Sequence, residues 1–491
     1  MVVRRRWASV VGALALSIGL SAPAFAQAPT PTAPEPAMPA PVAPEPVAPA
    51  PIAPAPIAPA PIAPEEPLPQ PPAALPELAP SNAQVAVHDA EPIPAQPEEE
   101  WYESFDVRLF ADAYFGWNYN SAKPQTRGNG VIRAFDTANG FALAWAGFDV
   151  SHAAEPVGGT LSLRFGPSAQ RYNSSCLSSK CDADYGLQNV KQAFASWRPI
   201  APITLDFGKF DTIYGAEVAE SQDNINYTRG VLYWLGQPLF HTGLRINAEL
   251  SENFGLRAMV VNGWNDTIDD NSGKTFGAQF TARAPRNEGH EWIAAALGYL
   301  GGPERDDALA VSCGAGEVFD STSTTGCSAG TTGDTSGTID RPSSNTRGWR
   351  HFVDLLVTSD PIDELHLVLN ADLGSENVRD AQTPTQFAWQ SWLGAMLGAR
   401  YLVSPKFALA GRAEIYKDKH GVTTGAVDGV PITDVVISTA TLTIDYLPAK
   451  NLLLRLDNRW DHSSKQIFPK GVRDHVGDLV STTLGVVVTT N

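Results

Sequence analysis

The sequence is poor in cysteine and in positive charge, and beyond its first residues it lacks long apolar runs. Its 35 lysines and arginines stand against 53 acidic residues, and the net charge of −18 argues against a nucleic-acid partner. After residue 26 no segment has the unbroken apolar run of a membrane helix, and helical periodicity is nearly absent. A bundle of membrane helices is therefore excluded.

The first hundred residues do not predict a folded domain. Residues 1–26 combine three arginines, an apolar run over 8–20 and the small-residue ending AFA, which is typical of a cleaved signal peptide. Residues 27–100 contain 24 of the 40 prolines and ten acidic residues but no basic one. This composition predicts a disordered, extended Pro/Ala-rich linker, and the barrel topology predicted below places it in the periplasm. Residues 101–491 are expected to form the folded domain.

The rest of the chain alternates apolar and polar residues, as strands do. We predict sixteen strands, at about 104–119, 140–152, 157–168, 189–199, 202–212, 239–250, 253–264, 275–286, 290–300, 349–359, 363–376, 388–402, 406–418, 432–447, 451–462 and 477–490. Short connections such as PIA and SP alternate with long ones such as 213–238 and 301–348. This alternation predicts an all-β fold, a transmembrane antiparallel up-and-down barrel with its short turns at the periplasmic rim.

The two faces of each predicted strand differ in polarity. In DVRLFADAYFGWNY, Leu109 and Phe115 share one face, while Arg108 and Asp112 share the other. We expect the apolar face to meet lipid and the charged face to line a water-filled lumen.

Aromatic residues gather near both ends of the strands, which predicts two interfacial belts. The members are Trp101, Tyr102, Trp197, Trp292, Tyr401 and Tyr446 at the short turns, and Trp117, Tyr119, Trp264, Trp349, Trp389, Tyr416 and Trp460 at the long loops.

Several motifs resemble a known family. The segments KQAFASW, ITLDFGKFDTIYGAEVAESQDNINYTRG, QPLFHTGLRI and VVNGWND, within 191–266, resemble the OmpL-like beta-barrel porin family, also called beta-barrel porin-2. A looser likeness extends to YLVSPKFALAGRAEIYKDKHG at 401–421. The resemblance implies an outer-membrane barrel of a Gram-negative-type bacterium that conducts small solutes.

The third long loop, 214–237, is a candidate constriction because the corresponding loop of porins commonly folds into the lumen. An ordinary loop across the mouth is the equal alternative. The candidate residues are Glu217, Glu220, Asp223, Asn224, Asn226 and Arg229.

Charges of both signs are predicted to face the lumen from the strands. They could create a transverse field across a pore, or they could satisfy one another in salt bridges. The residues are Arg245, Arg412, Glu414, Arg455, Asp457 and Arg459.

The four cysteines lie in Gly/Ser/Thr/Asp-rich segments of an exported chain. Two local disulfides are expected, Cys176 with Cys181 and Cys313 with Cys327. Zinc is the alternative, but no histidine lies near either pair.

Neither a metal, a cofactor nor an enzymatic activity is expected. The acidic loop with Asp266, Asp269, Asp270 and Asn271 lacks the spacing of a calcium loop. Residues His462, Ser463 and Ser464 invite a hydrolase interpretation, yet neighbours on one strand alternate faces.

The leading hypothesis is a porin for passive diffusion of small hydrophilic solutes or ions. The alternatives are a structural barrel, tethered to peptidoglycan or a periplasmic protein through residues 27–100, and a barrel-borne hydrolase.

Overall fold

The structure, a computed structural model, covers the folded domain predicted from residue 101. The described residues are 104–122, 132–133, 139–174, 182–269, 273–287, 290–304, 309–314, 316–320, 327–330, 333, 336–339, 348–379, 387–427 and 430–490. The predicted signal peptide, the Pro/Ala-rich linker, and Cys176 and Cys181 lie outside them.

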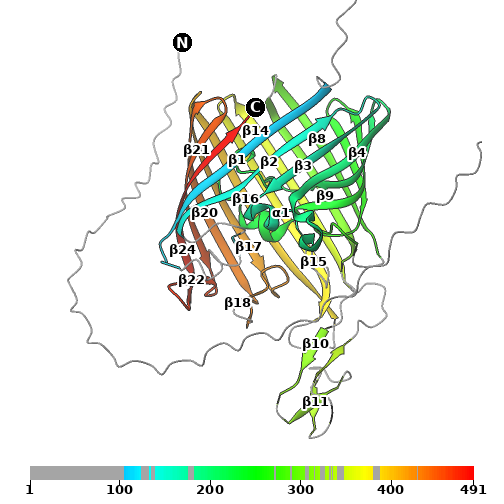
Figure 1. The fold of residues 1–491 in the computed structure, drawn as a ribbon, viewed down its shortest axis with the longest axis vertical. Helices are drawn as coiled ribbons and strands as arrows, with labels where there is room; N and C mark the ends of the chain where they lie inside the picture. The colour runs from blue at the N-terminus through cyan, green and yellow to red at the C-terminus, as the bar shows by residue number, and fades with distance from the viewer. Residues whose placement is uncertain are drawn as a thin grey trace, which may run out of the picture. The chain divides into compact units, whose positions relative to one another are not determined.

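Sixteen antiparallel strands close into one barrel (Figure 1). They are β1 (Phe105–Asn118), β2 (Asn139–His152), β3 (Val157–Phe165), β4 (Val190–Ile200), β5 (Ile203–Asp211), β6 (Phe240–Ser251), β7 (Phe254–Val261), β8 (Thr275–Asn287), β9 (His290–Pro303), β14 (Trp349–Ile362), β15 (Leu365–Arg379), β16 (Phe387–Ser404), β17 (Phe407–Asp418), β20 (Val435–Ala449), β21 (Leu452–Ser463) and β24 (Asp478–Thr489). All sixteen predicted strands are confirmed, with ends shifted by only a few residues. Strand β1 pairs with β24, so both ends of the barrel sheet lie at the short-turn rim.

The strands have one apolar, exposed face and one buried, largely polar face. In β1, Leu109 is 49% exposed whereas its neighbour Phe110 is 5% exposed. In β17, Leu409 and Ile415 are exposed while Arg412 and Glu414 are buried. A barrel in lipid requires this arrangement, because the hydrocarbon meets only the outer side chains.

Two of the aromatic residues predicted for the interfacial belts point inward instead. Tyr416 is fully buried, because it shares the inner face of β17 with Arg412 and Glu414. Trp264 follows the end of β7 and packs edge-on against Phe352. The prediction was wrong for these two, since it used distance from the strand end and ignored the face.

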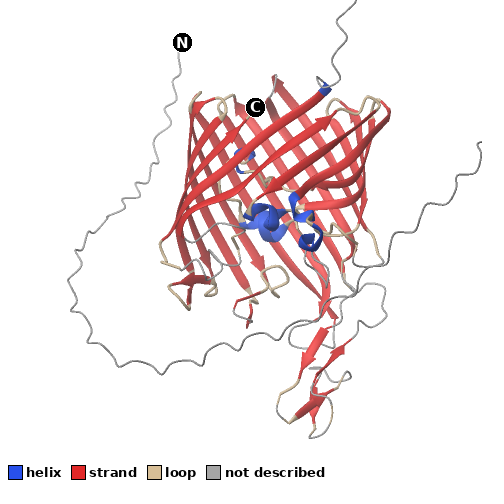
Figure 2. Ribbon diagram, in the orientation of Figure 1, coloured by secondary structure: helices blue, strands red, loops and turns tan. Residues whose placement is uncertain are grey.

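Helix is scarce, and what exists lies in the long loops (Figure 2). The short helix α1 (Pro167–Tyr172) lies between β3 and β4. None of the helices in the described part of the chain is long and apolar enough to cross a membrane.

Small two-stranded sheets form within three of the long loops. They pair β10 (Leu309–Ser312) with β13 (Ser336–Ile339), β11 (Glu317–Phe319) with β12 (Cys327–Ala329), β18 (Ala426–Val427) with β19 (Val430–Pro431), and β22 (Phe468–Lys470) with β23 (Asp474–Val476).

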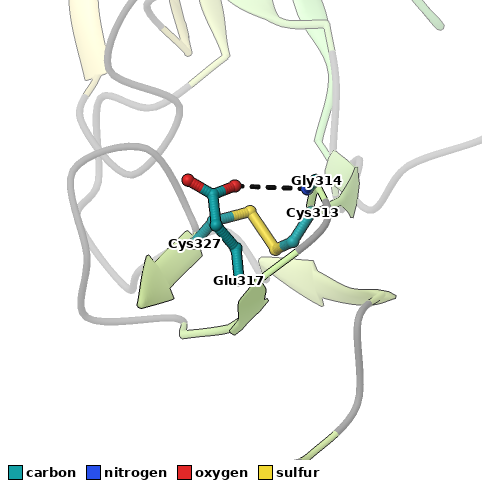
Figure 3. Close-up of a disulfide and its surroundings, with 4 residues drawn as sticks. All are labelled: Cys313, Gly314, Glu317 and Cys327. Atoms are coloured by element: carbon teal, nitrogen blue, oxygen red, sulfur yellow. Dashed lines mark hydrogen bonds between the residues drawn. A yellow bond between two sulfur atoms is a disulfide. The ribbon is translucent and has the colours of Figure 1, made fainter. Parts of the chain in front are cut away.

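The predicted disulfide between Cys313 and Cys327 is confirmed (Figure 3). Its partners are 14 residues apart in the sequence, in the loop between β9 and β14. Beside it the backbone N–H of Gly314 donates a hydrogen bond to Oε2 of Glu317 at 3.2 Å. The disulfide joins two segments of a loop that lies outside the barrel sheet.

Candidate functional site

The segment 212–239, which joins β5 to β6, runs through the interior of the barrel. We call it the inner loop. Its residues contact inward side chains of strands far apart around the barrel, including Asp112 of β1, Asn370 of β15 and Asp457 of β21. From Tyr214 to Leu239 nearly every residue is buried or half-buried, with Val218 and Asp223 the exposed exceptions. The inner loop therefore occupies much of the lumen cross-section.

Glu217 connects the inner loop to the opposite wall. Its carboxylate forms an ion pair with Arg412 of β17 and accepts a hydrogen bond from the backbone N–H of Gly230 at 2.8 Å. Arg412 also contacts Glu414 at 3.1 Å, and Glu414 accepts a bond from the backbone N–H of Leu232. Burial raises the pKa of Glu217 above its ordinary value, even though Arg412 lies against it. Two carboxylates thus share the buried guanidinium of Arg412.

Glu220 connects the loop to the other side of the barrel. Its carboxylate lies 2.9 Å from Arg164 of β3 and 2.7 Å from Lys191 of β4. Burial alone would raise its pKa, but these two cations outweigh it and bring the pKa down to about 2. Glu220 therefore stays ionised at any physiological pH.

Two aspartates of the wall bind the middle of the inner loop. Asp457 accepts hydrogen bonds from the backbone N–H groups of Tyr227 and Thr228, at 3.2 and 2.8 Å. Asp112 of β1 accepts from Ser221 at 2.7 Å and from the Tyr227 hydroxyl at 2.6 Å. A carboxylate that accepts backbone N–H bonds fixes the course of the main chain as well as a side chain.

The remaining predicted constriction residues also make defined contacts. Asp223 lies 3.3 Å from Arg108 of β1, and the Asn226 amide donates to Thr443 of β20. Asn224 bonds within the loop to Val218, whereas Arg229 donates to the Tyr172 hydroxyl of α1 at 3.0 Å.

Five of the six predicted lumen charges contact the inner loop, and one does not. Arg412, Glu414 and Asp457 do so as described. Arg455 donates to the carbonyls of Ser221 and Asn226, and Arg459 to that of Arg229. Arg245 instead pairs with Asp206 at 2.8 Å, away from the loop.

Several residues that hold the loop were not predicted from the sequence, chiefly Arg164, Lys191 and Tyr172. Arg164 could have been found, because it is a cation within the alternation of LSLRF and must face inward. Lys191 lies within the family-like segment KQAFASW. Tyr172 gave no signal, because it belongs to a short helix inside a long connection.

Other candidate sites remain separate from this interior. His462 is on the outer face of β21, beside Asp478 at 2.9 Å, whereas Ser463 is buried on the inner face. Asp269 pairs with Lys274, and residues 270–271 lie outside the described part of the chain. Within that part, no cluster of three His, Cys, Asp or Glu could hold a metal.

An open cavity of about 900 Å3 lies inside the barrel near the short-turn rim. Its lining comes from β4, β6, β7, β8, β9 and β14 and includes Glu249, Arg257, Thr281 and Arg283. Toward the long loops the same wall carries a buried apolar cluster with Phe210, Tyr214, Met259, Val261, Leu300 and Phe352. The open interior of the described barrel therefore includes a chamber, lined in part by charged side chains, on the short-turn side of the inner loop.

Comparison with known proteins gives a family and several structural neighbours. A family model described as beta-barrel porin-2, OmpL-like, matches residues 104–489. The outer membrane channel DcaP of Acinetobacter baumannii is similar at 11% identity over 78% of this chain and 96% of its own, with a TM-score of 0.47. OprB of Pseudomonas putida is similar at 12% identity over 79% of this chain and 94% of its own, with a TM-score of 0.46. OmpF of Salmonella typhi, in a complex with daunomycin, is similar at 13% identity over 78% of this chain and 97% of its own, also with a TM-score of 0.46. No curated protein matches the chain.

Proposed function

We propose, on the premise that the chain belongs to the OmpL-like beta-barrel porin-2 family, that its barrel is a narrow channel for passive diffusion of small hydrophilic solutes or ions. Family membership makes the chain an outer-membrane porin. The proposal of passive diffusion rests on the chamber of about 900 Å3, because its charged and hydroxylated side chains suit water and polar solutes.

The inner loop is the constriction of this channel. Glu217 and Glu220 anchor it on opposite sides of the lumen through buried ion pairs. A loop held at both sides by charge-assisted bonds stays inside the lumen and narrows it. Asp223, which is exposed, is the predicted constriction residue most available to a passing solute.

The channel is tested by refolding residues 101–491 and recording single-channel currents in a planar bilayer. We expect ohmic steps, small for a sixteen-strand barrel because the inner loop fills much of the lumen. A barrel without such steps would favour the structural alternative. Hydrolysis of an added lipid or peptide would instead revive the hydrolase alternative.

The Pro/Ala-rich segment supports a second, additional role as a periplasmic spacer. Residues 27–100 lie outside the described part of the chain, so this proposal rests on composition and on the barrel. The ten acids and 24 prolines, without a basic residue, favour an extended chain. The β1–β24 pairing brings the start of the barrel to the short-turn rim, which we assign to the periplasm.

Deleting residues 28–97 should leave conductance and heat-resistant gel mobility unchanged but reduce co-sedimentation with peptidoglycan. A matched control replaces the segment with a Gly/Ser linker of equal length, which keeps the tether but removes the proline-rich chemistry. Co-sedimentation that survives the deletion would reject the spacer, and cleavage of the segment by protease on intact cells would reject its periplasmic location.

A further inference from the structure

The chamber on the short-turn side of the inner loop has small residues on its wall. Gly255, Ala294 and Ala296 line it, and they come from β7 and β9. A Cβ added at Gly255 would lie 2.7 Å from the Thr281 hydroxyl, so even one methyl group would crowd the lining. The chamber is therefore a built space with room for a small solute.

Arg257 lies in the chamber and lacks an acidic partner. Its side chain is exposed, and its guanidinium donates one hydrogen bond, from Nη1 to Oε1 of Gln279 at 3.2 Å. Gln279 in turn donates to the carbonyl of Ile213 in the inner loop, so Gln279 links Arg257 to that loop. No carboxylate of the described chain forms an ion pair with Arg257.

Most other inward arginines differ from Arg257 because each has a carboxylate partner. Arg245 pairs with Asp206, Arg350 with Glu376, and Arg400 with Asp445. An arginine left without a partner in this setting is available to a solute.

Glu249 is the complementary group. It is exposed in the same chamber, and within the described chain its carboxylate forms neither an ion pair nor a hydrogen bond. In the register of β6 and β7, Asn247 faces Arg257 and Glu249 faces Gly255, so Glu249 and Arg257 are diagonal neighbours. Such neighbours are about 7–8 Å apart. An unpaired acid and an unpaired base thus lie on one wall with a gap between them.

The two other arginines of the chamber already donate hydrogen bonds to backbone carbonyls. Arg283 lies 3.6 Å from Glu291 and donates to the Glu252 carbonyl at 2.7 Å. Arg198 donates to the Ala201 carbonyl at 3.0 Å. The lining holds three arginines and three glutamates, so it has no net charge that would concentrate a simple anion or cation.

We propose that this chamber binds small zwitterions, namely α-amino acids or short peptides, with the carboxylate on Arg257 and the ammonium on Glu249. The inference rests on the proposed channel, whose preferred solutes it names. A zwitterion satisfies both unpaired groups at once, whereas an anion or a cation satisfies one and leaves the other uncompensated.

The test uses three probes of nearly equal size: L-alanine, propionate, which lacks the ammonium, and ethylammonium, which lacks the carboxylate. Saturation-transfer NMR on the purified full chain in detergent measures binding without requiring conduction. We expect L-alanine to bind about tenfold more tightly than either single-charge probe. The substitutions Arg257→Gln and Glu249→Gln should each remove this preference. Arg286→Gln, on the adjacent strand β8 but outside the chamber and paired with Asp363, is the matched control and should keep this preference.

Equal binding of propionate and L-alanine, equal binding of ethylammonium and L-alanine, or no binding at all would overturn the zwitterion site. Single-channel currents of the same preparation separate this failure from that of the channel. A conducting barrel that does not bind L-alanine refutes only the site, and a barrel that binds L-alanine but does not conduct refutes only the channel.

Discussion

Replacing residues 216–236 with a linker of about three Gly/Ser residues should raise single-channel conductance several-fold. The substitution removes a segment whose residues are almost all buried inside the barrel, so water and ions would fill the vacated space. The geometry permits a short linker, because the Gln237 side chain packs against Gly215 and donates to the Tyr214 carbonyl at 3.2 Å. Single-channel recording in a planar bilayer measures the effect.

The wall charges released by this replacement would be solvated by water in the lumen, so the barrel should remain folded. Its stability comes from the closed ladder of strands, which the replacement does not touch. Excision of residues 309–339 is the control, because the described strands of that segment pair with one another outside the barrel sheet. If both variants conduct like the unmodified protein, the inner loop is not the constriction.

The sequence was sufficient to predict the barrel because lipid imposes a period of two on every strand. The alternation of Leu409 and Ile415 with Arg412 and Glu414 needs no knowledge of neighbouring strands. The prediction of the aromatic belts failed where both the face of a residue and its position along the strand had to be known. Tyr416 is at the right depth for an interfacial belt but on the inner face, and its hydroxyl donates to the Leu235 carbonyl at 3.3 Å.

The course of the inner loop could not be derived in the same way, because its partners are far away in the sequence. Thr228 bonds Asp457, 229 residues later, and Ser221 bonds Asp112, 109 residues earlier. Nothing local to 214–237 distinguishes an inward loop from one across the mouth. The unpaired state of Arg257 was equally hidden, since the sequence shows a charge but not which charges find partners.

Arg412→Gln should undock the inner loop while the barrel stays folded. The substitution leaves Glu217 and Glu414 buried without their shared cation, and an uncompensated buried charge costs about 3–5 kcal/mol. That cost can be relieved by movement of the loop, which brings Glu217 into water, without breaking strand pairing. We therefore expect a higher and noisier conductance and a new tryptic cleavage after Arg229, which is buried in the docked loop.

Adding Glu217→Gln to Arg412→Gln removes one of the two stranded carboxylates and should restore part of the protection from trypsin, so the two sites should be strongly non-additive. Arg286→Gln controls for loss of a cation, because its partner Asp363 is 60% exposed and solvent screens such a pair. Unchanged proteolysis and conductance in Arg412→Gln would mean that the hydrogen bonds of Asp112 and Asp457 hold the loop without the ion pair.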